Sequence, residues 1–275
     1  MAALHFEISG SARSELKISE TKIMSLKTAA RLLLISGLIC GWVQTISAQT
    51  ADEVVEKYLA AIGGRAALGK LKSRSMVGTV TLSTPVGNVS GPVEVLNQAP
   101  SKTRSVMKLD LSGVGLGQVV VDQRFDGEAG YVLDTLQGNR AITGDVLENM
   151  KNSSFPNALL NYKETGSTVE LGGKEKAGER DAYVLIGKPK SGPAIRLYID
   201  AESYLPIKTV VKINVPQLGR EVEQTSEFSD YREVDGVKIA FQVKSSSPLQ
   251  TYVINFTKAE HNTDIDQSLF SKPAQ

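Results

Sequence analysis

The sequence has little of the chemistry that most enzymes use for catalysis. Its 275 residues include one cysteine (Cys40), one tryptophan (Trp42) and two histidines (His5 and His261). A Ser-His-Asp or Cys-His catalytic site needs a histidine, and zinc or iron sites usually recruit several histidines or thiolates. The composition therefore leaves little material for nucleophilic catalysis or for a transition-metal centre, and we expect no cofactor.

A segment near the start, residues 24–48, is typical of a secretory signal peptide. Lys27 and Arg31 form a basic n-region, residues 32–43 (LLLISGLICGWV) form an apolar h-region, and Ala48 supplies a small residue at the cleavage site. The apolar run is shorter than the roughly 20 residues that a spanning helix requires. We expect cleavage after Ala48 and a periplasmic product. A short membrane anchor or a buried helix is the alternative interpretation.

Cleavage there would simplify the chain further. Residues 49–275 have no cysteine, and their 26 Lys and Arg nearly balance 27 Asp and Glu. Without disulfide bonds the exported protein depends on its hydrophobic core. The near-neutral charge argues against a nucleic-acid partner, and no later run is long enough to span a bilayer. Residues 1–23 precede a second Met and are interpreted as an extension from a start codon assigned too early.

The mature chain opens with one helix signal and then changes to strands. Thr50 and Glu53 have the spacing of a capping box, an apolar stripe follows at helical period, and Gly63-Gly64 ends the helix. From Arg74 onward, short β-type runs are separated by turn residues at intervals of about 8–12 residues. The predicted strands are 75–82, 89–97, 102–111, 118–125, 129–133, 168–171, 182–188, 194–200, 206–215, 221–232, 237–245 and 251–260.

One interruption divides these strands. Between Thr143 and Tyr162, apolar residues predict two short helices broken near Asn152 and Pro156. No repeat or linker divides the chain. We therefore predict a single mainly β (α+β) domain over 49–275. It has a large antiparallel sheet curled into an incomplete barrel, an N-terminal helix, and a helical insertion that acts as a lid or a plug.

Several motifs invite a functional interpretation and favour a structural one. His261, Asp264 and Asp266 have the residue types of a metal site, but their position predicts a solvated chain end. The glycines of 113–117 precede a strand instead of the helix that a phosphate loop requires. Asp126 with Glu128, and Asp230 with Asp235, border turns where Asp is common. The charged residues of 174–176 and 179–181 predict a solvated loop.

What remains is apolar. A helical insertion over a curved sheet either fills it completely or covers a cavity. If a cavity exists, its wall is predicted to include side chains of the central strands and of the insertion: Val119, Val121, Tyr131, Leu133, Leu147, Met150, Phe155 and Leu159.

Four stretches resemble hairpins and the leading helix of one family. They are 56–64 (EKYLAAIGG), 125–131 (FDGEAGY), 197–208 (LYIDAESYLPIK) and 229–241 (SDYREVDGVKIAF). They are similar to phrases of the outer-membrane lipoprotein-sorting superfamily, the LolA/LolB-like fold, and the resemblance spans roughly residues 51–270. It implies an incomplete antiparallel barrel wrapped round one or more helices, with an apolar cavity that holds acyl chains. It identifies no lipoprotein-handling residue here.

Three hypotheses follow. The first is a periplasmic module that binds lipid or lipoprotein acyl chains in an apolar half-barrel cavity, without catalysis. The second is an envelope sensor or scaffold that binds a protein partner through the same half-barrel, for example by adding a strand at an open sheet edge. The third is an exported hydrolase, which would need clustered acidic residues in a polar cleft.

Overall fold

The computed structural model describes residues 49–84, 87–215, 219–248 and 250–273, which belong to one compact unit, Gln49–Gln275. The predicted signal peptide and the residues before it lie outside the described part. The helices are α2 (Ala51–Ala61), α3 (Gly64–Leu68) and α4 (Gly144–Asn152), with 3-10 turns η1 (Ser112–Val114) and η3 (Gln267–Phe270). The strands are β1 (Ser73–Thr84), β2 (Gly87–Gln98), β3 (Lys102–Asp110), β4 (Gln118–Phe125), β5 (Gly130–Asp134), β6 (Arg140–Ile142), β7 (Thr168–Ala177), β8 (Arg180–Lys188), β9 (Ile195–Asp200), β10 (Pro206–Val215), β11 (Arg220–Val234), β12 (Val237–Ser246) and β13 (Thr251–His261).

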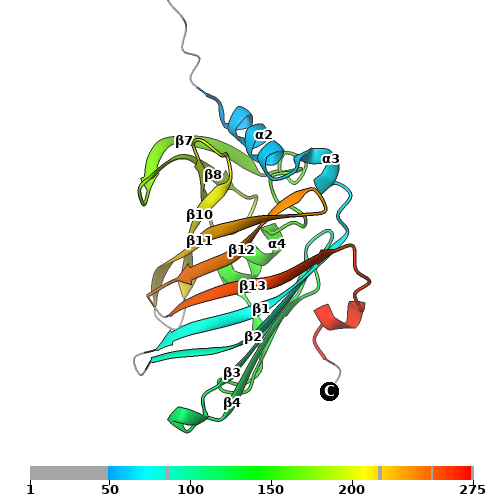
Figure 1. The fold of residues 1–275 in the computed structure, drawn as a ribbon, viewed down its shortest axis with the longest axis vertical. Helices are drawn as coiled ribbons and strands as arrows, with labels where there is room; N and C mark the ends of the chain where they lie inside the picture. Colours follow the sequence, from blue (N-terminus) through cyan, green and yellow to red (C-terminus); the bar gives the residue numbers. More distant parts are fainter. Residues whose placement is uncertain (1–48, 85–86, 216–218, 249, 274–275) are drawn as a thin grey trace, which may run out of the picture. The chain divides into compact units, whose positions relative to one another are not determined.

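The strands form a single 13-stranded sheet, which confirms the predicted mainly β fold class. Its order is β6-β5-β4-β3-β2-β1-β13-β12-β11-β10-β9-β8-β7, so two antiparallel meanders are joined where β1 pairs with β13 (Figure 1). Among the described residues, β6 and β7 are not paired with each other. The sheet therefore has two open edges and forms an incomplete barrel.

The sheet curls strongly enough for its two halves to face each other. Val121 on β4 and Ile213 on β10 line one cavity although six strands separate them in the sheet. The curl coincides with close backbone approaches: a Cβ atom on Gly91 would lie 1.8 Å from the carbonyl oxygen of Lys108. Gly78, at a bulge in β1, approaches β13 in the same way. Glycine is required here because any side chain would collide with the neighbouring strand.

Helix α2 closes one end of the curled sheet. Its predicted capping box is present, since the Thr50 hydroxyl accepts from Glu53 N and the Glu53 carboxylate accepts from Thr50 N. The buried stripe of Val54, Val55, Tyr58 and Leu59 belongs to the main core, together with side chains of both sheet halves. The end of the helix is fixed where Lys238 N donates to the carbonyl of Ile62 at 3.0 Å.

Helix α4 spans the opening between the two halves. Leu147 and Met150 pack with Phe125, Val132 and Ile142 of the first meander. On the other side, the backbone N–H of Asn214 on β10 donates to the Asp145 carboxylate at 2.7 Å.

The second predicted helix of the insertion is wrong, because residues 153–167 form turns without helix. Pro156 disfavours helical backbone at the residue before it, and the Asn157 side chain accepts from Leu159 N in a local turn.

Two other strand regions differ from the sequence analysis. Strand β6 was not predicted, because three residues are too few to show a period. The predicted loop at 174–181 is instead a hairpin, in which Lys174 pairs with Tyr183 and Ala177 with Arg180. Charged side chains suit an edge strand, where they stay in water while the backbone pairs on one side.

The convex face carries a buried ion cluster. The Asp122 carboxylate accepts from both Arg104 and Arg124 at 2.7 Å, and its side chain is 7% exposed. Burial opposes the charge on Asp122, but the two guanidinium groups hold its pKa below the usual value. The C-terminal segment covers this face, where Phe270 packs with Leu96 and Ile265, and Arg124 also donates to Ser271 O.

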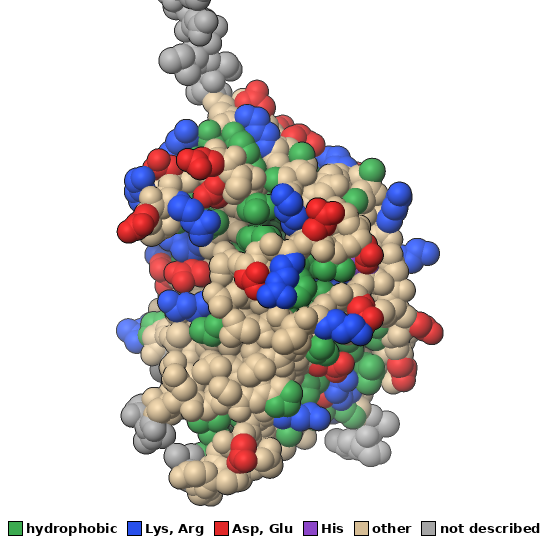
Figure 2. Space-filling model, viewed as in Figure 1, with side chains coloured by type: hydrophobic (Ala, Val, Ile, Leu, Met, Phe, Trp, Pro, Cys, Tyr) green, Lys and Arg blue, Asp and Glu red, His purple; other side chains and the backbone are tan. Residues whose placement is uncertain are grey.

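Charged groups of both signs mix over the surface in Figure 2, without one large basic patch on this face. Within the described ranges, no helix combines the length and apolar character needed to cross a bilayer.

Candidate functional site

A hollow of about 640 Å³ lies between the facing halves of the sheet, at the end away from α2. We call it the mouth cavity. Most of its lining is apolar and comes from nine strands and the segments that follow β3, β5 and β12. Its lining residues are Val80, Leu82, Met107, Leu109, Leu111, Val119, Val121, Gln123, Val132, Asp134, Leu136, Gln137, Arg140, Ile213, Val222, Gln224, Ser245, Ser247, Gln250 and Tyr252.

The main charged groups of the mouth cavity neutralise each other. The buried Asp134 carboxylate accepts from the backbone N–H groups of Leu136 and Gln137 at 2.9 Å and pairs with Arg140 at 3.2 Å. Burial opposes its charge, but these donors together hold the pKa of Asp134 below its usual value. Asp134 is therefore an ionised, satisfied carboxylate that caps a turn, and it is unsuited to act as a general acid near neutral pH.

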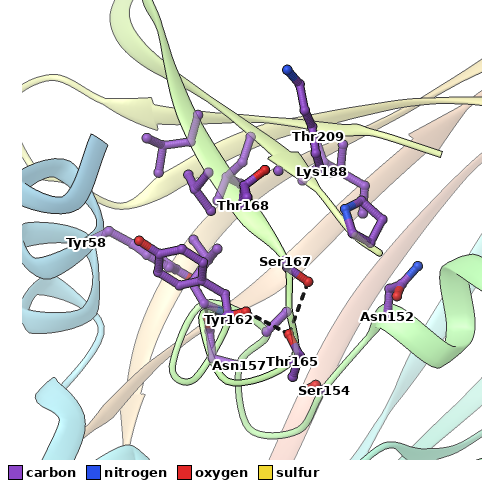
Figure 3. A pocket seen from close by; sticks show the side chains of 18 of the residues that line it. Tyr58, Asn152, Ser154, Asn157, Tyr162, Thr165, Ser167, Thr168, Lys188 and Thr209 are labelled. Atoms are coloured by element: carbon purple, nitrogen blue, oxygen red, sulfur yellow. Dashed lines mark hydrogen bonds between the residues drawn. The ribbon is translucent and has the colours of Figure 1, made fainter. Parts of the chain in front are cut away.

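A second hollow, of about 270 Å³, lies beneath residues 152–168, and we call it the lid cavity. Its apolar side is formed by Leu159, Val169, Leu185, Ile195 and Leu197. Figure 3 shows its polar side, where Tyr58 of α2, Asn152 of α4 and the hydroxyls of Thr165, Ser167 and Thr168 surround the space. Two of these hydroxyls interact, since Thr165 Oγ1 donates to Tyr162 O at 2.8 Å and lies 3.0 Å from Ser167 Oγ.

Several other polar groups of the lid cavity are also engaged. Lys151 pairs with Glu148 at 2.9 Å, and Lys188 pairs with Glu170 at 2.7 Å. The Tyr58 hydroxyl accepts from Asn157, and burial raises the pKa of Tyr58 to about 12, so the phenol stays neutral. The lid cavity thus offers a small apolar space whose charged rim residues, Lys151 and Lys188, are both paired.

The predicted wall residues separate into three groups. Val119 and Val121 line the mouth cavity, and Leu159 lines the lid cavity. Leu147 and Met150 pack against Phe125 and Val132, and Phe155 is buried in the main core.

Tyr131 and Leu133 are not brought to either cavity. In the pairing of β4 with β5 they stand opposite Arg124 and Asp122, on the face that carries the buried ion cluster. The ring of Tyr131 lies under the Lys272 ammonium at 5.0 Å. Their neighbours Val132 and Asp134 point inward instead, because successive strand residues alternate between faces.

Most of the mouth-cavity lining was missed from the sequence. The inward residues of β1, β3, β10 and β11, such as Leu82, Met107, Ile213 and Val222, belong to predicted strands. Their alternation gives a signal for which residues share a face, but it does not tell which face is concave.

The predicted solvated position of His261 is wrong. Its side chain is 1% exposed, Nδ1 lies 3.3 Å from the Asp235 carboxylate, and Nε2 has no partner in the described structure. His261 stands opposite Arg74, whose guanidinium lies 5.5 Å from the Phe155 ring. Burial and the nearby Arg74 charge hold the pKa of His261 below its usual value, despite the opposing effect of Asp235. Burial likewise lowers the pKa of Arg74 to about 10, so it stays charged near neutral pH.

No group of three or more His, Cys, Asp and Glu side chains is placed to hold a metal ion in the described part of the chain. His261, Asp264 and Asp266 therefore do not converge. The Asp266 carboxylate instead accepts from Ser268 N at 2.9 Å and caps η3.

No family model and no curated protein matches this sequence. Solved structures do match. A DUF1329 family protein from Desulfovibrio piger is 13% identical, with a TM-score of 0.52 over 82% of this chain and 98% of its own. A LolA superfamily protein from Nitrosomonas europaea is 15% identical, with a TM-score of 0.51 over 82% of this chain and 99% of its own. The resemblance noted in the sequence is therefore confirmed at the level of fold, and the chain has a LolA-like fold.

Proposed function

We propose that this chain is a periplasmic, non-catalytic module that holds the acyl chains of a lipid or lipoprotein in the mouth cavity. The observation that carries the proposal is the mouth cavity itself, about 640 Å³, where twelve of the twenty lining residues are apolar. Binding sites for small molecules usually have about 300–1,000 Å³, and apolar walls with few polar groups are typical of them.

The driving force would be the transfer of methylene groups out of water. Each buried methylene contributes about 0.8 kcal/mol. Because Asp134 and Arg140 neutralise each other, the wall carries no single charge that calls for a charged ligand. The headgroup of the lipid would remain at the opening, in water.

A protein-binding role through the sheet edge has weaker support. Strand β7 is an edge of the sheet, but it carries Lys174, Glu175 and Lys176 and is broken by a bulge after Leu171. Charged residues and bulges on an edge strand disfavour the addition of another strand.

The test is to recover the protein from the periplasm of an expressing bacterium and to examine it by native mass spectrometry and lipid extraction. We expect a lipid in stoichiometric amount, and after delipidation we expect saturable binding of a fluorescent fatty acid. The absence of both would overturn the proposal. A stoichiometric protein partner without lipid would support the sensor hypothesis instead.

A further inference from the structure

The mouth cavity has two kinds of wall. On one side, strands β1, β3 and β4 contribute six apolar side chains and a single polar one, Gln123. On the other side, β11, β12 and the turn after β12 contribute four side chains that hydrogen-bond without carrying a charge. These are Gln224, Ser245, Ser247 and Gln250, and we call them the polar wall.

The polar wall is built into the sheet. Gln224 Nε2 of β11 donates to Ser245 Oγ of β12 at 3.4 Å, and Ser245 is buried, at 3% exposure. In the strand pairing Ser245 stands opposite Tyr252 of β13, which also lines the cavity. Nearer the opening, Ser247 N donates to Gln250 O at 2.9 Å. The hydrogen-bonding side chains are therefore carried by paired strands and by a closed turn, and such rigid backbone suits a binding site.

The polar wall has hydrogen-bonding capacity to spare. Among the described residues, the Gln224 amide oxygen and the Gln250 side-chain amide have no protein partner. An alkyl chain placed against these groups would displace water without replacing its hydrogen bonds, which is unfavourable. A hydroxyl group both donates and accepts, so it would replace them.

The cavity offers no free charge to an ionic headgroup. Asp134 and Arg140 are its only charged lining residues, and they pair with each other at 3.2 Å. Phosphate and carboxylate groups are bound most strongly by guanidinium or ammonium groups that are available to them. The lining therefore favours an uncharged headgroup.

The volume limits how many chains can enter. A methylene group takes up nearly the space of one water molecule in the liquid, ~30 Å³, so 640 Å³ holds about 20 such groups. One long acyl chain with a small headgroup fills that space. A second chain of the same length would nearly double the demand and would not fit.

We propose that the ligand of the mouth cavity is a single-chain lipid with an uncharged, hydroxyl-bearing headgroup, of the monoacylglycerol kind. The chain lies against the apolar side formed by β1, β3 and β4. The headgroup sits at the opening, with the polar wall on one side and water on the other. This inference rests on the proposed function and narrows it to one class of lipid.

The experiment measures how well unlabelled lipids displace a fluorescent fatty acid from the delipidated protein. Monopalmitoylglycerol is the expected ligand. Methyl palmitate has the same chain without hydroxyl groups, palmitoyl lysophosphatidylglycerol adds a charge, and dipalmitoylglycerol adds a second chain. Each comparison therefore tests one feature of the proposed ligand.

The test variant combines Gln224→Leu with Ser245→Ala. Both partners of one hydrogen bond are removed together, so neither is left unpaired and the fold should tolerate the change. The matched control is Gln242→Leu with Ser229→Ala. This pair has the same residue types on the same two strands, bonds at 2.9 Å, and lines neither cavity. Urea unfolding is measured for each variant.

We expect the parent to bind monopalmitoylglycerol about tenfold or more tightly than each of the other lipids, because a site built for a hydroxyl group rejects analogues that lack it. The test variant should bind monopalmitoylglycerol about tenfold more weakly, through the loss of about two hydrogen bonds, and methyl palmitate at least as tightly as the parent does. The control should show the parent's preference.

The inference is overturned, and the proposed function stands, if the parent binds the fluorescent fatty acid but takes any of the three comparison lipids as tightly as monopalmitoylglycerol. It is also overturned if a folded test variant keeps the parent's preference. If the test variant does not fold, the preferences of the parent alone decide. If the parent binds no lipid at all, the proposed function fails as well.

Discussion

Filling the mouth cavity provides the sharpest test of acyl-chain binding. Val121 on β4 lines this cavity and stands opposite Met107 of β3 and Asp134 of β5. In Val121→Phe the ring would project into the 640 Å³ space and occupy room otherwise available to the ligand. If the ring excludes about three methylene groups, the loss is ~2 kcal/mol at about 0.8 kcal/mol for each methylene. That free energy corresponds to a dissociation constant about 30-fold larger, and so to weaker binding.

The same change should have little effect on the free energy of unfolding. Insertion of extra carbons into a well-packed core costs about 1–3 kcal/mol, because neighbouring side chains must move. Here the ring enters existing space, so we expect a cost at or below the lower limit of that range. Val77→Phe is the matched control, because Val77 is exposed and lines neither cavity.

The assay is titration of the delipidated protein with a fluorescent fatty acid, together with urea unfolding of each variant. Val77→Phe should bind as the parent does. The reasoning would be refuted if Val121→Phe were stably folded and bound the fatty acid within about twofold of the parent. It would also be refuted if the control lost affinity to the same extent, since the effect would then not depend on the cavity.

Three further predictions concern stability. Asp122→Asn leaves the guanidinium groups of Arg104 and Arg124 without their carboxylate, and should lower the free energy of unfolding, measured in urea, by about 3–5 kcal/mol. Asp230→Asn is the control: it breaks an exposed ion pair and should lower that free energy by about 0–1 kcal/mol. The folded state lowers the pKa of His261, so on acidification the unfolded state takes up a proton more readily than the folded state does. The free energy of unfolding should therefore fall as the pH drops from about 7 to 5. If His261→Gln left this pH dependence unchanged, the prediction would be contradicted. Gly91→Ala should prevent normal folding, because its Cβ would collide with the backbone of Lys108. In the control Gly113→Ala the Cβ meets no atom within 4 Å, so this variant should unfold at the same temperature as the parent. Circular dichroism during heating distinguishes the two outcomes.

Strand positions were largely predictable because turn chemistry is local. Asp235-Gly236 ends β11 and starts β12 at the predicted place, and Asp126-Gly127 separates β4 from β5. The capping box at Thr50 is likewise encoded within four residues. The hairpin at 174–181 was mistaken for a loop, because hydropathy reports side-chain environment, and an edge strand can keep charged side chains in water.

The candidate site was predictable only in part, because it depends on which face of each strand turns inward. Val119 and Val121 line the mouth cavity, while Tyr131 and Leu133 point to the opposite face. A difference of one residue decides between the two faces, and a strand with apolar residues on both sides does not reveal the choice.

By itself, the sequence determined the fold class, the leading helix and the scarcity of histidine and cysteine, since each of these depends on composition or on short spacings. Only the tertiary structure decided that the sheet curls tightly at Gly78 and Gly91, that the mouth cavity and the lid cavity remain, and that His261 is buried beside Arg74. These features join residues up to about two hundred positions apart, and the packing that creates them is a property of the assembled sheet. No local pattern in the chain carries that information.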